Sequence, residues 1–234
     1  MKLLRRLFES SLGKKFIMAV TGACLFLFAV GHMLGNLQFF LGAEPINRYA
    51  HFLQSVPELL WGARLGLLAM VGLHIWSAVK LTLENRAARP VAYDQATLAA
   101  ATYASRTMIW SGCIIGAFII FHLLHYTVKA PGVNLTGKDF ADFRTTLADG
   151  TPCNDVHKMM VTGFSQPLVA GFYVLAVGLL CFHLSHGISA LFQSLGLKDR
   201  TWGPIIDRFS MGVSLLLFLG YAAIPASVLL GFVK

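Results

Sequence analysis

Five apolar runs, each long enough to cross a bilayer, constrain this chain more than any other feature of its sequence. A transmembrane helix needs about 20 predominantly apolar residues, and a backbone that crosses lipid must satisfy its own hydrogen bonds, which favours helices. Composition agrees, because 56% of the 234 residues are hydrophobic and only 13% are charged. We therefore predict an all-α integral membrane protein that forms a single membrane domain over residues 1–234. The five predicted spans cover residues about 16–41, 59–83, 108–128, 168–194 and 205–233.

The basic residues are distributed unevenly between the two sides that five spans define. The net charge is +8, and most of the Lys and Arg precede the first span or lie in the second-to-third and fourth-to-fifth connections. By the positive-inside rule this side is cytoplasmic, so we expect the N-terminus in the cytoplasm and the C-terminus outside. The charge therefore indicates topology, and we expect no nucleic acid partner. The residues concerned are Lys2, Arg5, Arg6, Lys14, Lys15, Lys80, Arg86, Arg89, Arg106, Lys198, Arg200 and Arg208.

Motifs for a self-contained redox or nucleotide chemistry are missing from the sequence. The four cysteines form no CxxC pair and three of them lie inside predicted spans, which indicates neither an iron–sulfur cluster nor a disulfide framework. No GxGxxG or Walker-type loop is present, and no soluble domain of any size separates the spans. We expect any chemistry here to need a bound cofactor. The cysteines are Cys24, Cys113, Cys153 and Cys181.

Six of the eight histidines lie in predicted spans, distributed over the first four helices. An ionisable side chain at membrane depth is costly, and such residues usually face the bundle interior and serve a function. One such histidine alone would more often be a packed side chain bonded to a neighbour. Four helices that each carry one indicate a shared site. The six are His32, His74, His122, His125, His183 and His186.

Helix geometry separates these histidines into two depths. His32 and His122 stand 17 and 16 residues after the basic residues that begin their outward-running helices. At about 1.5 Å per residue, both lie roughly 25 Å from the inner face. His74 and His183 stand 12 and 15 residues before the basic residues that end their inward-running helices, so both lie toward the inner side. The sequence thus predicts one pair of imidazoles at each of two levels.

Two such pairs are typical of bis-histidine ligation of two b-type haems stacked across a membrane. A zinc or copper site is the alternative, but it would gather three or four ligands in one place. Depth leaves open whether His183 or His186 binds iron, because they differ by about 4.5 Å in height. Lys80, Arg86 and Arg89 could meet haem propionates or simply reflect positive-inside charge. Glycines that could admit the ring, or serve close helix packing, are Gly31, Gly35, Gly72, Gly112, Gly116 and Gly187.

A weak internal repeat relates the first and third spans. The segments MAVTGACLFLFAVGH and MIWSGCIIGAFIIFH share a methionine, a glycine and a final histidine at the same relative positions. In this register His122, rather than His125, is the equivalent of His32. The matched residues are Met18, Gly22 and His32 in the first span and Met108, Gly112 and His122 in the third.

The motifs around these histidines resemble those of the five-helix, two-haem cytochrome b subunit, of b558 type, that anchors succinate dehydrogenase or fumarate reductase in the membrane. The resemblance extends from about residue 13 to residue 233 and implies that the first four helices form a haem-binding bundle. The motifs, in chain order, are GHMLGN, GAEPINRYAHFLQSVP, LHIWSAVKL followed by NRAARP, FHLLHYTV and FHLSHGISALFQSLGL.

This resemblance implies a set of axial ligands to the two haem irons. The family's fourth-helix ligand stands four residues before a glycine, which here selects His183 and leaves His186 beside it. The third-helix ligand precedes Leu or Val, which selects His122. By resemblance, then, His32 and His122 bind the iron of the distal haem, and His74 and His183 bind that of the proximal haem.

The resemblance also implies partners and a place in the cell. It predicts a multi-pass subunit in the cytoplasmic membrane of a prokaryote, surrounded by membrane lipid and bound to a flavoprotein and an iron–sulfur subunit. Its haems would relay electrons to a quinone, often menaquinone, near the distal haem, with no succinate-oxidising site on this chain. Glu58 is the carboxylate expected to exchange protons with the quinone, although an anion at a helix start is favourable by itself. His51 and Arg64 are weaker candidates.

Two alternatives remain open from the sequence. The chain could be the di-haem cytochrome b anchor of another quinone-linked oxidoreductase, such as a formate dehydrogenase or a hydrogenase. It could also be a proton-coupled transporter that uses its membrane histidines as a relay. A transporter would show no haem spectrum and is expected to contain inverted repeats with broken helices.

Overall fold

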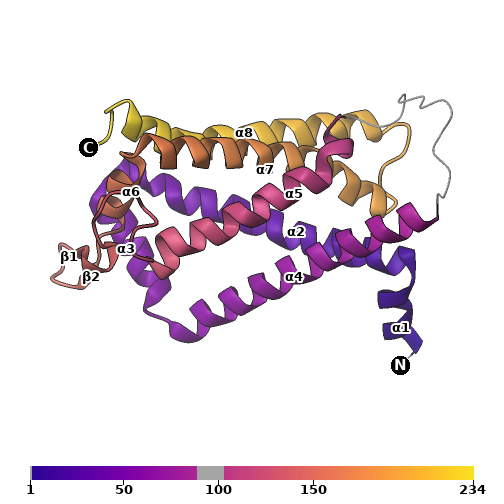
Figure 1. Ribbon diagram of the computed structural model, residues 1–234, viewed down its shortest axis with the longest axis horizontal. Helices are drawn as coiled ribbons and strands as arrows, with labels where there is room; N and C mark the ends of the chain where they lie inside the picture. The colour runs from indigo at the N-terminus through magenta and orange to yellow at the C-terminus, as the bar shows by residue number, and fades with distance from the viewer. Residues whose placement is uncertain (1, 89–102) are drawn as a thin grey trace.

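Five long helices alternate in direction along the molecule (Figure 1). The computed structural model describes residues 2–88 and 103–234, and each of the five helices is long and apolar enough to span a membrane. The structure therefore confirms the predicted helical membrane fold. The helices are α2 (Ser11–Asn36), continued by the 3-10 helix η1 (Leu37–Leu41), α4 (Pro57–Ala87), α5 (Tyr103–His122), continued by the π-helix η3 (Leu123–Val128), α7 (Pro167–Ser194) and α8 (Gly203–Leu229).

Local sequence signals explain where several of these helices begin and end. Proline in the first turn starts α4, α7 and α8, where its missing N–H would have no intrahelical partner in any case. Ser10 caps α2 by accepting a hydrogen bond from the Gly13 backbone N–H. Gly196, with φ of +75°, follows the end of α7 and permits the tight turn into α8. Arg89 and Pro90, in the connection after α4, lie outside the described residues.

The helix α7 lies at the centre of the packing and contacts α2, α5 and α8. Ala170 and Ala176 on α7 are fully buried, which lets neighbouring helices approach closely. The helix α4 packs mainly on α2, and Trp61, Leu65 and Leu68 on it are exposed. Such large apolar side chains on the outer surface of a helical bundle are suited to contact with lipid.

A small cap of short elements lies at the end of the bundle opposite the N-terminus (Figure 1). Asn47 joins two of its helices, because its side chain bonds both to the Asp155 carboxylate and to the His157 backbone N–H. Phe140 and Met159 are almost fully buried within it. The cap comprises α3 (Ala43–Gln54), the 3-10 helix η4 (Phe140–Asp142), the antiparallel strands β1 (Arg144–Thr146) and β2 (Pro152–Asn154), and α6 (Val156–Phe164).

The opposite end of the bundle carries the N-terminal helix α1 (Lys2–Glu9). Phe8 on α1 contacts Trp76 on α4, with ring centroids 5.5 Å apart. Lys14, in the first turns of α2, is buried and bonds to the Glu84 carboxylate on α4 and to the Glu9 carbonyl oxygen. The same end contains the α7–α8 turn (Figure 1), so the two chain termini lie at opposite ends of the bundle.

Candidate functional site

The cap-side pair of histidines, His32 on α2 and His122 at the end of α5, lies in direct ring contact. Their ring centroids are 5.8 Å apart and the rings are nearly perpendicular, at 80°. Imidazole nitrogens bind first-row metals at about 2 Å, so two imidazoles on opposite sides of one metal have centroids roughly 6 Å apart. Phe28, one turn before His32, stacks on its ring at 5.3 Å. The spacing of this pair therefore fits two axial ligands of one iron.

The N-side pair comprises His74 on α4 and His183 on α7. The two imidazoles are near enough to interact electrostatically. Each also has a hydroxyl at its Nδ1 atom: Thr21 Oγ1 lies 3.2 Å from that of His74, and Ser111 Oγ lies 3.2 Å from that of His183. The structure thus brings together the same pairs that helix depth predicted.

The two pairs lie at different heights in the bundle. On α2, Thr21, which meets the N-side pair, stands 11 residues before His32 of the cap-side pair. On α5, Ser111 stands 11 residues before His122 in the same way. At about 1.5 Å per residue this is a separation of roughly 16 Å along the helices. Within residues 2–88 and 103–234, no three His, Cys, Asp or Glu side chains gather as a zinc or copper site would require.

Four of the six glycines that the sequence offered as clearance for a haem have open space next to them. A methyl group added at Gly31, Gly72, Gly116 or Gly187 would meet no atom within 4 Å. Gly35, which the sequence offered as clearance, is instead filled by the Tyr49 ring, and Gly112 faces His183. Two imidazoles at each level are the donor set that the iron of a b-type haem takes.

Tyr173 on α7 links the cap-side pair to a third histidine. Its hydroxyl lies 3.3 Å from His122 Nδ1 and 3.0 Å from His125 Nδ1. His125 is only 1% exposed and stacks on Phe140 of the cap, with centroids 5.4 Å apart. His122 therefore faces His32, whereas His125 packs under the cap.

His186 lies near charged groups at the N-terminal end of the bundle. It interacts electrostatically with Lys198 and Asp207, which form an ion pair at 2.7 Å. Lys80 and Arg86, the candidate partners of haem propionates, are exposed on the last turns of α4. The imidazole of His186 thus has charged neighbours, whereas the imidazole of His183 lies next to a hydroxyl. The surroundings of these two histidines therefore differ.

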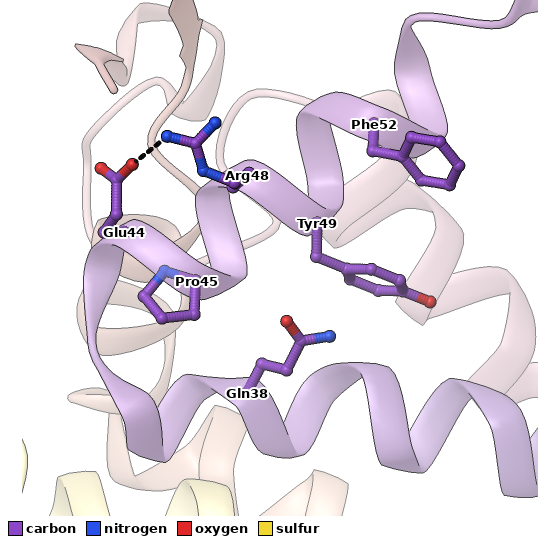
Figure 2. A pocket seen from close by; sticks show the side chains of 6 residues that line it. All are labelled: Gln38, Glu44, Pro45, Arg48, Tyr49 and Phe52. Atoms are coloured by element: carbon purple, nitrogen blue, oxygen red, sulfur yellow. Dashed lines mark hydrogen bonds and ion pairs between the residues drawn. The ribbon is translucent and has the colours of Figure 1, made fainter. Parts of the chain in front are cut away.

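A hollow of about 570 Å³ lies between η1, which continues α2, and the cap helix α3 (Figure 2). Tyr49 lines the hollow and also contacts α2. Its ring and hydroxyl occupy the place that a side chain at position 35 would take. Gly35 is three residues, about one helical turn, past His32. The hollow therefore opens close to His32. Its lining residues are Gln38, Glu44, Pro45, Arg48, Tyr49 and Phe52.

Arg48 is held at the rim of this hollow by two carboxylates. Its guanidinium donates to Glu44 and to Asp149, each at 2.6 Å, and these bonds raise the pKa of Arg48. Hydrogen bonds from Thr151 and from Arg48 hold the pKa of Asp149 well below its ordinary range. The cation and its partner are therefore charged at every pH at which the protein would work.

The three residues predicted to serve a quinone lie near the cap but do not line the hollow. Glu58 is exposed in the first turn of α4, His51 is half-buried on α3, and Arg64 stands over the Trp61 ring at 5.1 Å. Their roles stay predictions. The sequence interpretation missed Tyr173, which has no distinguishing motif. It also missed Thr21 and Ser111, although each directly precedes a glycine of the internal repeat.

Comparison with known proteins gives one finding. A family model described as the succinate dehydrogenase/fumarate reductase transmembrane subunit matches residues 85–221, which is more than half of the chain. The matched segment contains His122 of the cap-side pair and His183 of the N-side pair. Searches of curated proteins and of solved structures found no match.

Proposed function

The chain belongs to the succinate dehydrogenase/fumarate reductase transmembrane subunit family, and on this premise we propose that it is a di-haem cytochrome b that connects the iron–sulfur subunit of the complex to a quinone. Membership makes it the membrane subunit of such a complex, associated with the other subunits. The proposal adds two b haems, a flavoprotein and an iron–sulfur partner, and a site for quinone, with menaquinone expected. It also places the N-terminus in the cytoplasm of a prokaryote.

The observation that carries the proposal is the pairing of imidazoles at two levels of the bundle. The cap-side pair, at a centroid separation of 5.8 Å, would hold the distal haem, and the N-side pair would hold the proximal one. A bound b haem supplies one-electron transfer, which amino-acid side chains at these positions do not offer. The four histidines would hold the two haems from opposed helices, and the apolar side chains of these helices would limit the access of water.

The order of the two haem levels along the electron path follows from the proposed topology. The N-terminal end carries most of the basic residues, so positive-inside topology places it at the cytoplasm, where the soluble subunits would bind. Electrons would then reach the N-side pair before the cap-side pair. The cap, with the hollow beside His32, would face the outer side, and the quinone would react there.

The proposal places the quinone ring in the hollow. Its volume of about 570 Å³ is within the usual range for small-molecule sites. Tyr49, Gln38 and Arg48 supply hydrogen-bond donors for carbonyl oxygens, and Phe52 and Pro45 supply an apolar wall (Figure 2). Glu58, exposed at the same end of the bundle, is the carboxylate that would exchange protons with the quinone. Glu58→Gln should lower quinol turnover while both haems are retained, and unchanged turnover would refute that role.

A haem measurement on the purified complex tests the proposal. The reduced-minus-oxidised spectrum and haem quantitation should show two b haems per copy of this chain. His183→Ala should lose one haem, and the matched variant His186→Ala should retain both. A preparation without haem, or one in which His186→Ala rather than His183→Ala loses a haem, would contradict the assignment.

A further inference from the structure

The internal repeat has an equivalent contact in each half of the bundle. Thr21 on α2 and Ser111 on α5 occupy the same position of the repeat, directly before its glycine. Each hydroxyl oxygen lies 3.2 Å from the Nδ1 atom of one histidine on a neighbouring helix, namely His74 for Thr21 and His183 for Ser111. Both members of the N-side pair therefore meet the same kind of group through the same ring atom.

The hydrogen bonds of Thr21 fix the direction of its contact with His74. Thr21 Oγ1 lies 2.7 Å from the Ile17 carbonyl oxygen and 3.2 Å from that of Met18. A hydroxyl has a single proton, and these carbonyl oxygens can only accept it. The hydroxyl oxygen is then left to accept from the ring, so His74 Nδ1 carries the proton.

Ser111 repeats this arrangement in the second half of the bundle. Its Oγ atom lies 3.1 Å from the Met108 carbonyl oxygen, to which it donates its proton. The oxygen then accepts from His183 Nδ1–H. A neutral imidazole with its proton on Nδ1 has its lone pair on Nε2. In both histidines the nitrogen left to bind a metal is thus Nε2.

From these contacts we propose that Thr21 and Ser111 are paired positioning residues that fix the tautomer and ring orientation of the two N-side ligands, His74 and His183. The inference rests on the proposed function, since it takes these histidines as ligands of the proximal haem. A ligating imidazole whose other nitrogen donates a hydrogen bond is more basic. A more basic ligand stabilises the oxidised iron and lowers the midpoint potential.

The cap-side pair is arranged differently, which makes the effect specific to one level. His122 Nδ1 also meets a hydroxyl, but this belongs to Tyr173 and is shared with His125. Thr21 and Ser111, in contrast, are tied to the backbone of their own helices. Removing the hydroxyl of Thr21 or of Ser111 therefore changes the surroundings of the N-side pair. It leaves the contacts of the cap-side pair in place.

Redox titration of the purified complex, with the two haems resolved by their spectra, tests the proposal. Thr21→Val and Ser111→Ala should each raise the midpoint potential of the proximal haem. The ratio of reduced to oxidised proximal haem, read at the wild-type midpoint potential, should rise above one in each variant. The double variant should show the larger shift, and the distal haem should keep its potential in all three.

Conservative and matched variants separate the ligand contact from a general loss of a buried hydroxyl. Thr21→Ser and Ser111→Thr keep the hydroxyl and should retain the wild-type potential. Thr82 donates to the Ala78 carbonyl oxygen and Ser210 to the Ile206 carbonyl oxygen, each within its own helix. Among the described residues, no histidine bonds to either hydroxyl. Thr82→Val and Ser210→Ala should therefore leave both potentials unchanged.

Three results would overturn the inference. The first is an unchanged proximal potential in both Thr21→Val and Ser111→Ala, and the second is an equal shift of both haems. The third is a shift in the controls as large as that in the test variants. If Thr21→Val fails to assemble, Ser111→Ala decides the question alone. A wild-type complex without haem would instead refute the proposed function, so the two failures are distinguishable.

Discussion

Gly22 and Gly112 occupy equivalent positions in the two halves of the bundle but leave different amounts of room for their partner histidines. A methyl group on Gly22 would stand 3.1 Å from His74 Cε1, whereas one on Gly112 would stand 3.8 Å from His183 Cε1. The first distance requires the ring to move, and the second is an ordinary van der Waals contact. We expect Gly22→Ala to reduce proximal haem retention by about tenfold and Gly112→Ala to retain it, as measured by haem content and absorption maximum.

The control for this pair of variants is Gly212→Ala on α8. An added methyl group there meets no atom within 4 Å, and alanine is the better helix former by about 1 kcal/mol. Gly212→Ala should therefore keep both haems. Equal haem loss in Gly22→Ala and Gly112→Ala would show that the difference in distance has no consequence.

At the scale of single residues, the sequence predicted the histidine pairs but not the groups that hold them. The partners His32 and His122 follow from counting residues along helices, because depth in a bilayer depends on helix rise alone. Tyr173 could not be identified in this way. Which side chain meets His122 depends on how α5 and α7 rotate against each other, and rotation leaves little signal in a helix that is apolar all round.

Between elements, α2 and α4 are joined by an ion pair whose two members are unequally buried. The Lys14 side chain is 4% exposed and that of Glu84 is 42% exposed. Glu84→Gln would leave a buried ammonium without its counter-ion, at a cost of about 1–3 kcal/mol. Lys14→Met would leave only a carboxylate that water can reach, and an apolar side chain of similar size would fill its place. We expect Glu84→Gln to lower the thermal midpoint in detergent more than Lys14→Met does.

The double variant Lys14→Met/Glu84→Gln provides the check on this asymmetry. It removes the unpaired buried charge, so its thermal midpoint should recover most of the loss seen in Glu84→Gln. If Lys14→Met were the more damaging single change, the buried charge would not be the origin of the effect.

The cap element α6 should lose stability in acid because of His157. This ring stacks on Phe39 of η1 with centroids 4.9 Å apart, and burial lowers its pKa below the ordinary value of 6.5. When α6 opens, the ring binds a proton more readily than in the closed cap, so opening becomes easier as pH falls below about 6.5. At pH 5.5 opening should increase by up to about tenfold, measured by hydrogen exchange of α6 corrected for intrinsic rates.

His157→Phe is the matched control for this pH effect. Phenylalanine keeps a ring that can stack on Phe39 but has no proton to gain. Its α6 exchange should show no increase at pH 5.5 beyond that of the neighbouring cap elements. An acid-induced opening of the same size in His157→Phe would place the titrating group elsewhere.

At the scale of elements, the sequence predicted the long helices well and the cap poorly. Hydropathy identified five spans because each of them exceeds the length that lipid demands. Several of the helices extend beyond the predicted spans. The helix α2 begins at Ser11, before the buried Lys14, and α4 continues to Ala87. The cap elements are short, and they are held by contacts between distant residues, such as Arg48 with Asp149. Contacts of that kind leave no periodic pattern in a sequence.

For the whole molecule, α1 and the cap lie at opposite ends of the bundle (Figure 1). The histidines of the two pairs lie on the long helices that connect these ends. If electrons enter at the first end and leave at the second, both levels are required for reaction with quinone, and neither is required by the soluble subunits. His183→Ala and His122→Ala should therefore each abolish succinate-dependent quinone reduction. Both should retain succinate oxidation by a water-soluble dye, provided that the complex stays assembled. His157→Phe should retain both activities. Full quinone reduction in His122→Ala would mean that the quinone takes its electrons near the N-side pair, at the opposite end from the hollow.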